Sequence, residues 1–255
     1  MKYLINQKNL KLKIVLLFTL AINFAEAKNF IIGVEAIRYY PLYDFSANDT
    51  TKPSFTKEIL SVFFDANNYQ YQFVALPIKR FDKWYIEKNI DFKFPDNFRW
   101  RKDKENKLNI TFSQSVVKLI AGTYVLKNNK ESSRNDIKRL GTILGFVPTL
   151  WFDKIGSDNF TLVEESSPIS VIRHLLHGNV DATNIDPNVI QHNLKQLKEN
   201  KQIVLNKNIK HEEFSYHLSS IKHPEIIREF NNFLNNNKEL VESIKEKYGI
   251  DENFD

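Results

Sequence analysis

The carboxylates and histidines of this chain do not combine into a complete catalytic or metal-binding motif. Glu35, Asp96 and His217 are the side chains that we consider as general acids or bases, but the sequence places no recognisable partner beside them. It contains no nucleophile elbow, no metalloprotease helix and no phosphate-binding loop. His174 and His177 are spaced for a metal ion on a predicted helix, yet two histidines without a third ligand more often form a solvated helix face. We therefore expect no catalytic site, no metal and no cofactor.

Two predicted loops carry side chains that are suited to binding a small molecule. Aromatic rings in the first loop can stack on a ligand at little cost in conformational entropy, and the second loop offers charged and amide groups. These residues are Tyr40, Tyr43 and Phe45 in the first loop, and Lys93, Asp96 and Asn97 at and just beyond the end of the predicted strand 90–94. The chain has 20 Phe, 10 Tyr and 3 Trp, so we expect both a Phe-rich core and an aromatic-lined cleft.

The first 27 residues have the pattern of a secretory signal. Lysines at positions 2, 8, 11 and 13 precede an apolar run from Ile14 to Phe24, and Ala25-Glu26-Ala27 supplies the small residues of a cleavage site. As a helix this run is about 16 Å long, roughly half a bilayer core, so a permanent membrane anchor is the weaker alternative. The chain has no cysteine to carry a lipid. We expect a mature periplasmic protein that begins near Lys28 and is not a lipoprotein.

Composition limits the partners of the mature chain. Without the signal the remaining 228 residues hold 32 basic and 30 acidic side chains, and this near balance argues against nucleic-acid binding. The whole chain is 42% hydrophobic and 26% charged, which is typical of a globular protein. Because there are no disulfides, the fold must be stabilised by its core alone.

Strand and helix patterns alternate along the chain, which predicts an α/β fold with parallel sheets covered by helices. Two such units followed by a helical tail indicate two lobes with a cleft between them, and ligands of open α/β sheets bind beyond the carboxyl ends of the strands. The predicted strands are 30–36, 69–76, 90–94, 116–126, 138–145, 160–163, 179–184, 203–205 and 214–219. The predicted helices are 54–67, 78–88, one from Pro148, 169–176, 188–197, 224–234 and 238–247.

Six segments, in order, resemble the amino-acid-type (family 3) periplasmic solute-binding proteins of ABC importers, over essentially the whole mature chain. Residues 32–45 look like the "GV…YPPF.F" opening of that family, 54–60 like "GFDVDLL", and 76–91 like "LPWKR…GKVD". Residues 140–145 resemble "LGVQVG", 178–186 resemble "GRVDAVVVD", and 245–250 fit "EKYG". Each segment alone is weak, and the ordered set carries the resemblance.

The resemblance implies a type II periplasmic-binding-protein fold in two lobes. Lobe one would comprise residues 28–120 and 221–255, lobe two residues 121–220, with crossings near 122–124 and 216–218. Such proteins are monomers that close around one small solute and present it to a membrane permease. A sensory or accessory protein that docks on a receptor would have the same lobes, and a few dehydratases share the fold.

The same resemblance implies a set of ligand contacts. Arg99 or Arg101, with Arg99 preferred, would clamp a ligand carboxylate through bidentate hydrogen bonds. Asp186 would receive a ligand amine with help from Asn184, although a carboxylate there would also stabilise the start of a helix whatever binds.

The chain departs from the family pattern in two loops. Residues 93–98 read Lys-Phe-Pro-Asp-Asn-Phe where the family has small hydroxylated residues, and Phe146 stands where the family often has a threonine that donates to the ligand. Backbone N–H groups near Phe146 and Thr149 would have to replace that donor. We expect a small polar or zwitterionic, amino-acid-like solute, and these loops leave open whether it is a free α-amino acid.

Overall fold

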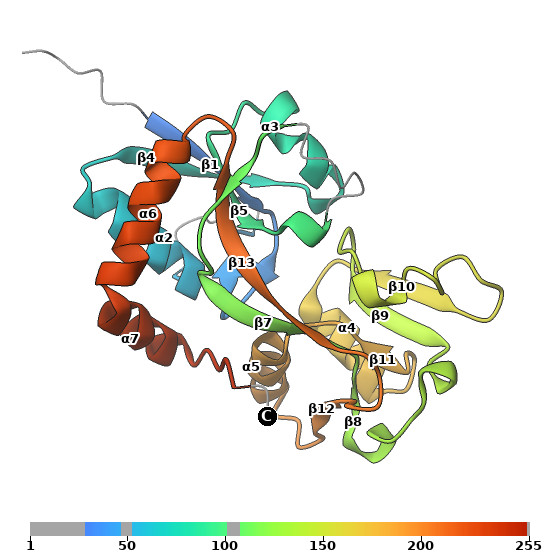
Figure 1. Cartoon of the computed structure of the whole chain (residues 1–255). Helices are drawn as coiled ribbons and strands as arrows, with labels where there is room; N and C mark the ends of the chain where they lie inside the picture. Colours follow the sequence, from blue (N-terminus) through green and yellow to red (C-terminus); the bar gives the residue numbers. More distant parts are fainter. Residues whose placement is uncertain (1–28, 47–52, 101–107, 254–255) are drawn as a thin grey trace, which may run out of the picture.

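The protein is described here from a computed structural model that covers residues 29–46, 53–100 and 108–253. The predicted signal segment and Arg101 lie outside these described residues. Within them, no helix combines the length and the hydrophobicity that crossing a membrane would require. Two mixed sheets, each packed against helices, form the molecule (Figure 1).

The first sheet is built mainly from the N-terminal part of the chain. β1 pairs in parallel with β4 and β5, whereas β13 runs antiparallel to β5 and β6. In sheet order the strands are β4 (Gln70–Leu76), β1 (Asn29–Glu35), β5 (Phe92–Asp96), β13 (Glu212–Ser220) and β6 (Thr111–Phe112). A small hairpin and four helices accompany this sheet: β2 (Arg38–Tyr39), β3 (Tyr43–Asp44), α2 (Phe55–Ala66), α3 (Trp84–Glu87), α6 (Pro224–Asn236) and α7 (Lys238–Tyr248).

The second sheet is built from the middle of the chain. β9 pairs in parallel with β10 and β11, and β8 runs antiparallel to β11 and β12. In sheet order the strands are β10 (Thr161–Glu165), β9 (Arg139–Ile143), β11 (Ala182–Thr183), β8 (Tyr124–Leu126) and β12 (Ile203–Leu205). The helices α4 (Pro168–Leu176) and α5 (Pro187–Leu197) pack against each other, and α4 packs on β9.

Two chain segments connect the sheets side by side. β7 (Val117–Ala121) pairs antiparallel with the first half of β13, and this long ribbon runs between the two halves of the molecule in Figure 1. The chain passes to β8 through Gly122 and Thr123, and it returns between β12 and β13, where the Asn206 N–H donates to the Thr123 carbonyl (2.9 Å). Residues 216–218, the predicted second crossing, lie inside β13 where its pairing changes from β7 to β5 and β6.

Three predicted elements differ from the structure. The helix expected from Pro148 is only a 3₁₀ turn, Thr149–Trp151. The Trp151 side chain at its end stacks on Phe160 and donates to the Thr123 hydroxyl (3.2 Å), and these contacts take the place of a longer helix. The predicted helix 78–88 is a 3₁₀ helix, Ile78–Lys83, followed by α3. The predicted strand 116–126 is two strands in different sheets.

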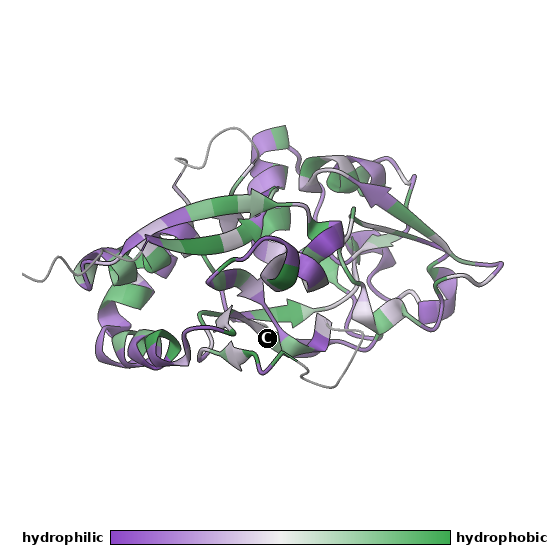
Figure 2. Cartoon of the chain, turned by 90° about the horizontal axis from the view of Figure 1, so that it is seen from above, coloured by the Kyte–Doolittle hydropathy of each residue, from purple (hydrophilic) through white to green (hydrophobic). Residues whose placement is uncertain are grey.

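The core of the first half is rich in phenylalanine, as the composition predicts. The helical spacing at 54–67 becomes α2, whose Phe63 and Phe64 are completely buried. Phe63 contacts the rings of Phe64, Phe230 and Phe233 with centroid separations of 5.1, 4.9 and 5.6 Å. Hydrophobic residues are concentrated in the central strands, and the helices alternate hydrophobic and hydrophilic stretches along their ribbons (Figure 2).

The Phe63→Ala variant should lose about 3–5 kcal/mol of unfolding free energy in urea denaturation, because the ring leaves a cavity among three others. Phe152→Ala is the matched control, since that ring is 55% exposed. Similar losses in the two variants would contradict the packing described for α2.

Candidate functional site

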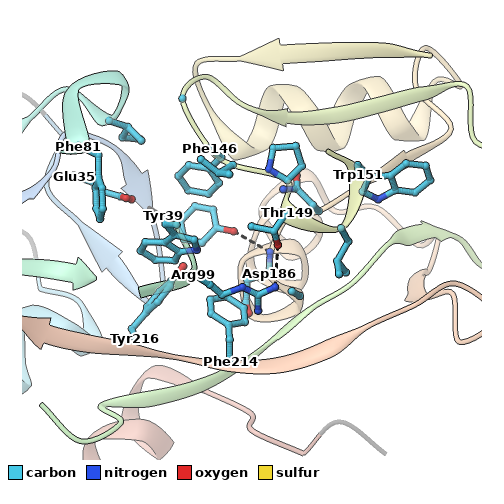
Figure 3. Close-up of a pocket in the computed structure, with 18 of the residues that line it drawn as sticks. Glu35, Tyr39, Phe81, Arg99, Phe146, Thr149, Trp151, Asp186, Phe214 and Tyr216 are labelled. Carbon is cyan, nitrogen blue, oxygen red and sulfur yellow. Dashed lines mark hydrogen bonds between the residues drawn. The ribbon is translucent and has the colours of Figure 1, made fainter. Parts of the chain in front are cut away.

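A cavity of about 310 Å³ lies between the two sheets, beyond the carboxyl ends of β1, β9 and β11. Its lining comes from both halves of the molecule and from the connecting strands, and Tyr39, Arg99, Thr149 and Asp186 lie close together in Figure 3. The polar lining residues are Glu35, Tyr39, Tyr43, Lys79, Arg99, Thr149, Asn184, Asp186 and Tyr216.

Asp186 supplies a buried carboxyl group with one unsatisfied oxygen. It precedes Pro187 at the first turn of α5, where its Oδ1 accepts from the Asn188 N–H (2.8 Å) as a helix cap. Its Oδ2 is buried and has no hydrogen-bond partner among the described residues, and the same holds for Oδ1 of Asn184. Burial raises the pKa of Asp186 to about 7, against the N–H groups at the start of α5, which lower it.

Tyr39 joins the two halves of the molecule at this carboxyl group. Its hydroxyl accepts from the backbone N–H of Asp186 (2.9 Å), and its ring contacts those of Tyr43 and Phe146. Burial, reinforced by the charge of Asp186, raises the pKa of Tyr39 well above its usual range, so the hydroxyl keeps its proton. That proton is a further hydrogen-bond donor at the cavity.

Glu35 brings a second buried carboxyl group to the cavity. It ends β1 and accepts a short hydrogen bond from the hydroxyl of Tyr43. Burial raises the pKa of Glu35 to about 7, whereas the Tyr43 hydrogen bond and the charge of Lys93 act in the opposite direction. The cavity thus contains two carboxyl groups that titrate near neutral pH.

Arg99 bridges the two halves at the cavity wall. Its guanidinium donates to the Thr149 hydroxyl (2.9 Å) and forms a short ion pair with Glu212 at the start of β13. The same group lies 5.1 Å from the ring centre of Phe214. The Arg99 side chain is 20% exposed, so these contacts hold it against the wall.

Half of the predicted ligand residues line the cavity. These six are Tyr43, Arg99, Phe146, Thr149, Asn184 and Asp186. Five others lie elsewhere, and Arg101 is not among the described residues.

The five displaced residues have structural contacts. The Tyr40 ring packs at a tilt against His192 of α5 (ring centres 4.4 Å apart), and Phe45 is buried against Phe73. The Lys93 ammonium donates to the Phe81 carbonyl, behind the cavity wall (2.8 Å). Two more are held at β13: the Asp96 carboxylate accepts from Ser219, and the Asn97 amide donates to the Ser215 carbonyl (2.7 Å).

The other candidates for acid–base chemistry are not assembled with Glu35. Asp96 and His217 are register partners on β5 and β13, but His217 contacts the Ser113 carbonyl through Nδ1 (2.8 Å). His174 pairs with Glu165 (2.8 Å) on the second sheet. No group of three potential metal ligands occurs in the described parts of the chain.

Sequence reasoning missed most of the aromatic wall. Phe214 and Tyr216 alternate on β13, so both face the cavity, and that alternation was visible in the predicted strand. Phe81 and Trp100 carry no comparable signal, because a kinked helix and a short 3₁₀ turn place them. Tyr39, rather than its neighbour Tyr40, faces the cavity.

The halves also approach closely at Gly145, which follows β9 with φ of +93°. A Cβ there would lie 3.0 Å from the Lys79 backbone nitrogen and 3.2 Å from Ile78. Gly178 also has positive φ (+73°), but a Cβ there would meet nothing within 4 Å. A comparison of substitutions at these two glycines therefore distinguishes the effect of backbone strain from the effect of contact between the halves.

Gly145→Ala and Gly178→Ala should each lose about 1 kcal/mol of unfolding free energy through the left-handed backbone. Only Gly145→Ala should also increase the radius of gyration in small-angle X-ray scattering, because its methyl group separates the halves. Equal scattering profiles for the two variants would contradict the close approach.

Asp186→Asn should stabilise the ligand-free protein at pH 8 by on the order of 3 kcal/mol. The folded pKa of Asp186 is raised above the unfolded value, so wild-type stability falls as the pH rises from about 4 to about 7. The gain of the variant should therefore vanish near pH 4. Urea denaturation across this range measures it, with the exposed Asp158→Asn as control; parallel pH profiles for the two variants would disprove the assignment.

No protein-family model matches the sequence, and no curated protein does. Solved structures share the fold over most of both chains. The arginine-, lysine-, histidine-binding protein ArtJ of Geobacillus stearothermophilus is 17% identical, with a TM-score of 0.66 over 87% of this chain and 95% of that one. An ABC uptake transporter substrate-binding protein of Streptococcus pneumoniae with bound histidine is 14% identical, with a TM-score of 0.66 over 89% and 96%.

A third match, the ancestral amino-acid-binding protein AncCDT-1, a precursor of cyclohexadienyl dehydratase, is 17% identical. Its TM-score is 0.64 over 86% of this chain and 95% of that one. The structural similarity establishes the architecture, whereas identities this low do not identify the ligand. The chain has the two-lobed α/β fold of the type II periplasmic binding proteins, as its sequence predicts.

Proposed function

We propose that this protein is a periplasmic solute-binding protein that captures a small, polar, amino-acid-like solute between its lobes. One observation carries the proposal: Asp186, whose Oδ2 is buried and unpartnered, lines a cavity to which both halves contribute. Leaving a buried carboxyl oxygen without a partner costs free energy, and a ligand that donates a hydrogen bond there recovers it.

A protonated amine is the ligand group that suits this position. It would donate a charge-assisted hydrogen bond to Asp186 and another to Oδ1 of Asn184, which is likewise unpartnered. The aromatic wall would cover the apolar part of the solute, and a volume of about 310 Å³ suits a small molecule. Closure over the ligand would remove water and strengthen each polar contact.

The lobe boundaries belong to the same proposal. Residues 28–120 and 221–255 form one lobe and residues 121–220 the other, with β7 and β13 as the connecting ribbon. Contacts across this division support it, since Tyr39 meets Asp186 and Arg99 meets Thr149.

Delivery to an ABC importer is the role that we favour, following the predicted secretory signal and the transporter protein from Streptococcus pneumoniae among the structural matches. A sensory or accessory protein that docks on a receptor remains the alternative with the same lobes. Co-purification of a permease or of a receptor from detergent-solubilised membranes would distinguish the two.

An enzyme on the same fold is the second candidate, and Glu35 is the observation in its favour. This buried group lies in the cavity with a pKa of about 7, which suits a general acid or base. We propose binding without turnover, because neither Asp96 nor His217 lies at the cavity. Mass spectrometry after incubation with cyclic carboxylic acids tests this, and formation of any product would favour the enzyme.

A thermal-shift screen of amino acids, amines and small organic acids should yield a ligand that depends on Asp186. At about 100 times its Kd a ligand adds roughly 2.7 kcal/mol to the unfolding free energy, a shift of a few degrees. Asp186→Asn should weaken binding by about 10- to 100-fold through loss of a charged partner, and Asp158→Asn should leave it unchanged. A ligand that binds both variants equally would refute the role of Asp186.

A further inference from the structure

We propose that the cavity recognises an amine that carries no carboxylate, and that Arg99 acts as a latch between the lobes instead of an anion clamp. This inference rests on the proposed function and specifies its ligand class. It follows from a count of which polar groups at the cavity are already hydrogen-bonded and which are not.

The positive charge of Arg99 is already compensated. Glu212 forms an ion pair with its guanidinium, the Thr149 hydroxyl accepts from the same nitrogen, and the ring of Phe214 lies beside it. Both contacts use the same nitrogen, so a ligand carboxylate could still meet the other N–H groups of Arg99. It would then share one positive charge with Glu212, and repulsion between the two carboxylates would reduce the free energy gained.

Three backbone N–H groups of the loop after β9 also donate within the protein. The N–H groups of Gly145, Phe146 and Thr149 donate to the Glu164 carboxylate (3.2 Å), the Ile143 carbonyl (2.9 Å) and the Val147 carbonyl (2.8 Å). Because this segment forms only a three-residue 3₁₀ turn, it also lacks the start of an α-helix at which anions bind.

The buried side-chain atoms at the cavity that lack a partner among the described residues are acceptors, and the hydroxyl proton of Tyr39 is an uncharged donor beside them. Oδ2 of Asp186 and Oδ1 of Asn184 are buried and unpartnered, and Glu35 adds a second carboxyl group to the cavity. A ligand carboxylate in this enclosed space would face these oxygens, whereas an ammonium group satisfies them. Lys79 also lines the cavity, but its side chain is exposed, so it adds charge only at the rim.

Arg99 instead connects the lobes. It follows β5 of the first sheet, and the hydroxyl that it contacts follows β9 of the second. The dashed lines of Figure 3 show this bond beside the one between Tyr39 and Asp186. Loss of the Arg99 contact should therefore destabilise the closed state by the same amount for every ligand.

Isothermal titration with amino acids and their decarboxylated counterparts tests both parts of the proposal. The pairs are arginine and agmatine, lysine and cadaverine, histidine and histamine, and phenylalanine and phenethylamine. In the pair that binds best, the amine should bind at least as tightly as the amino acid. Arg99→Ala should weaken the two members of this pair by factors that agree within about threefold, whereas loss of a carboxylate clamp would separate them by roughly 10- to 100-fold.

Thr149→Val removes the hydroxyl that accepts from Arg99 and changes no charged group, whereas Thr149→Ser keeps a hydroxyl at this position. Thr149→Val should weaken amine binding and increase the radius of gyration of the amine complex, and Thr149→Ser should recover both. Lys79→Met should leave the preference for the amine unchanged.

Two results would overturn the proposal in distinguishable ways. If the amino acid binds far more tightly than its amine, and Arg99→Ala or Lys79→Met abolishes the difference, the site has a carboxylate clamp while the solute-binding function stands. If no member of any pair binds, in titration or in native mass spectrometry, the proposed function fails and this inference fails with it.

Discussion

The hydrogen bond from the Asp186 backbone to the Tyr39 hydroxyl is the contact on which the geometry of the cavity depends. It fixes the first turn of α5 against the hairpin that follows β1, so the two sheets meet at a carboxyl group. Because Pro187 and Asn188 shape that turn, one oxygen of Asp186 is satisfied locally as a helix cap. The other oxygen is buried without a hydrogen-bond partner among the described residues, so its cost of desolvation is uncompensated.

The remaining contacts between the halves surround this point and give the cavity its chemical character. Arg99 and Thr149 meet at one wall, and Gly145 lies against Ile78 and Lys79 at another. The aromatic side chains of β13 line the ribbon that connects the lobes. Arg99 and three backbone N–H groups donate within the protein, whereas two buried acceptors lack a partner among the described residues, and our ligand proposal follows from this difference.

Particular residues show how far sequence reasoning reaches in this protein. The strand at 30–36 and the helices at 54–67 and 238–247 are found almost as predicted, since each depends on local periodicity and turn chemistry. Asp186 and Asn184 were identified because they follow a strand in a recognisable loop. Tyr40, Phe45, Lys93, Asp96 and Asn97 lie in the predicted loops or strand ends, yet they do not line the cavity. In each case the direction of the side chain was not encoded by its position alone.

The fold class, the alternation of elements and the loops of the binding site could all be predicted from the amino-acid sequence. These follow from hydrophobic periodicity and from the carboxyl ends of parallel strands, both properties of short segments. The contacts of Arg99 with Glu212 and Thr149 could be seen only in the folded protein. The same is true of the position of Tyr39, rather than Tyr40, beside Asp186. These contacts join residues 50 to 147 positions apart, so they exist only once the two lobes have packed against each other.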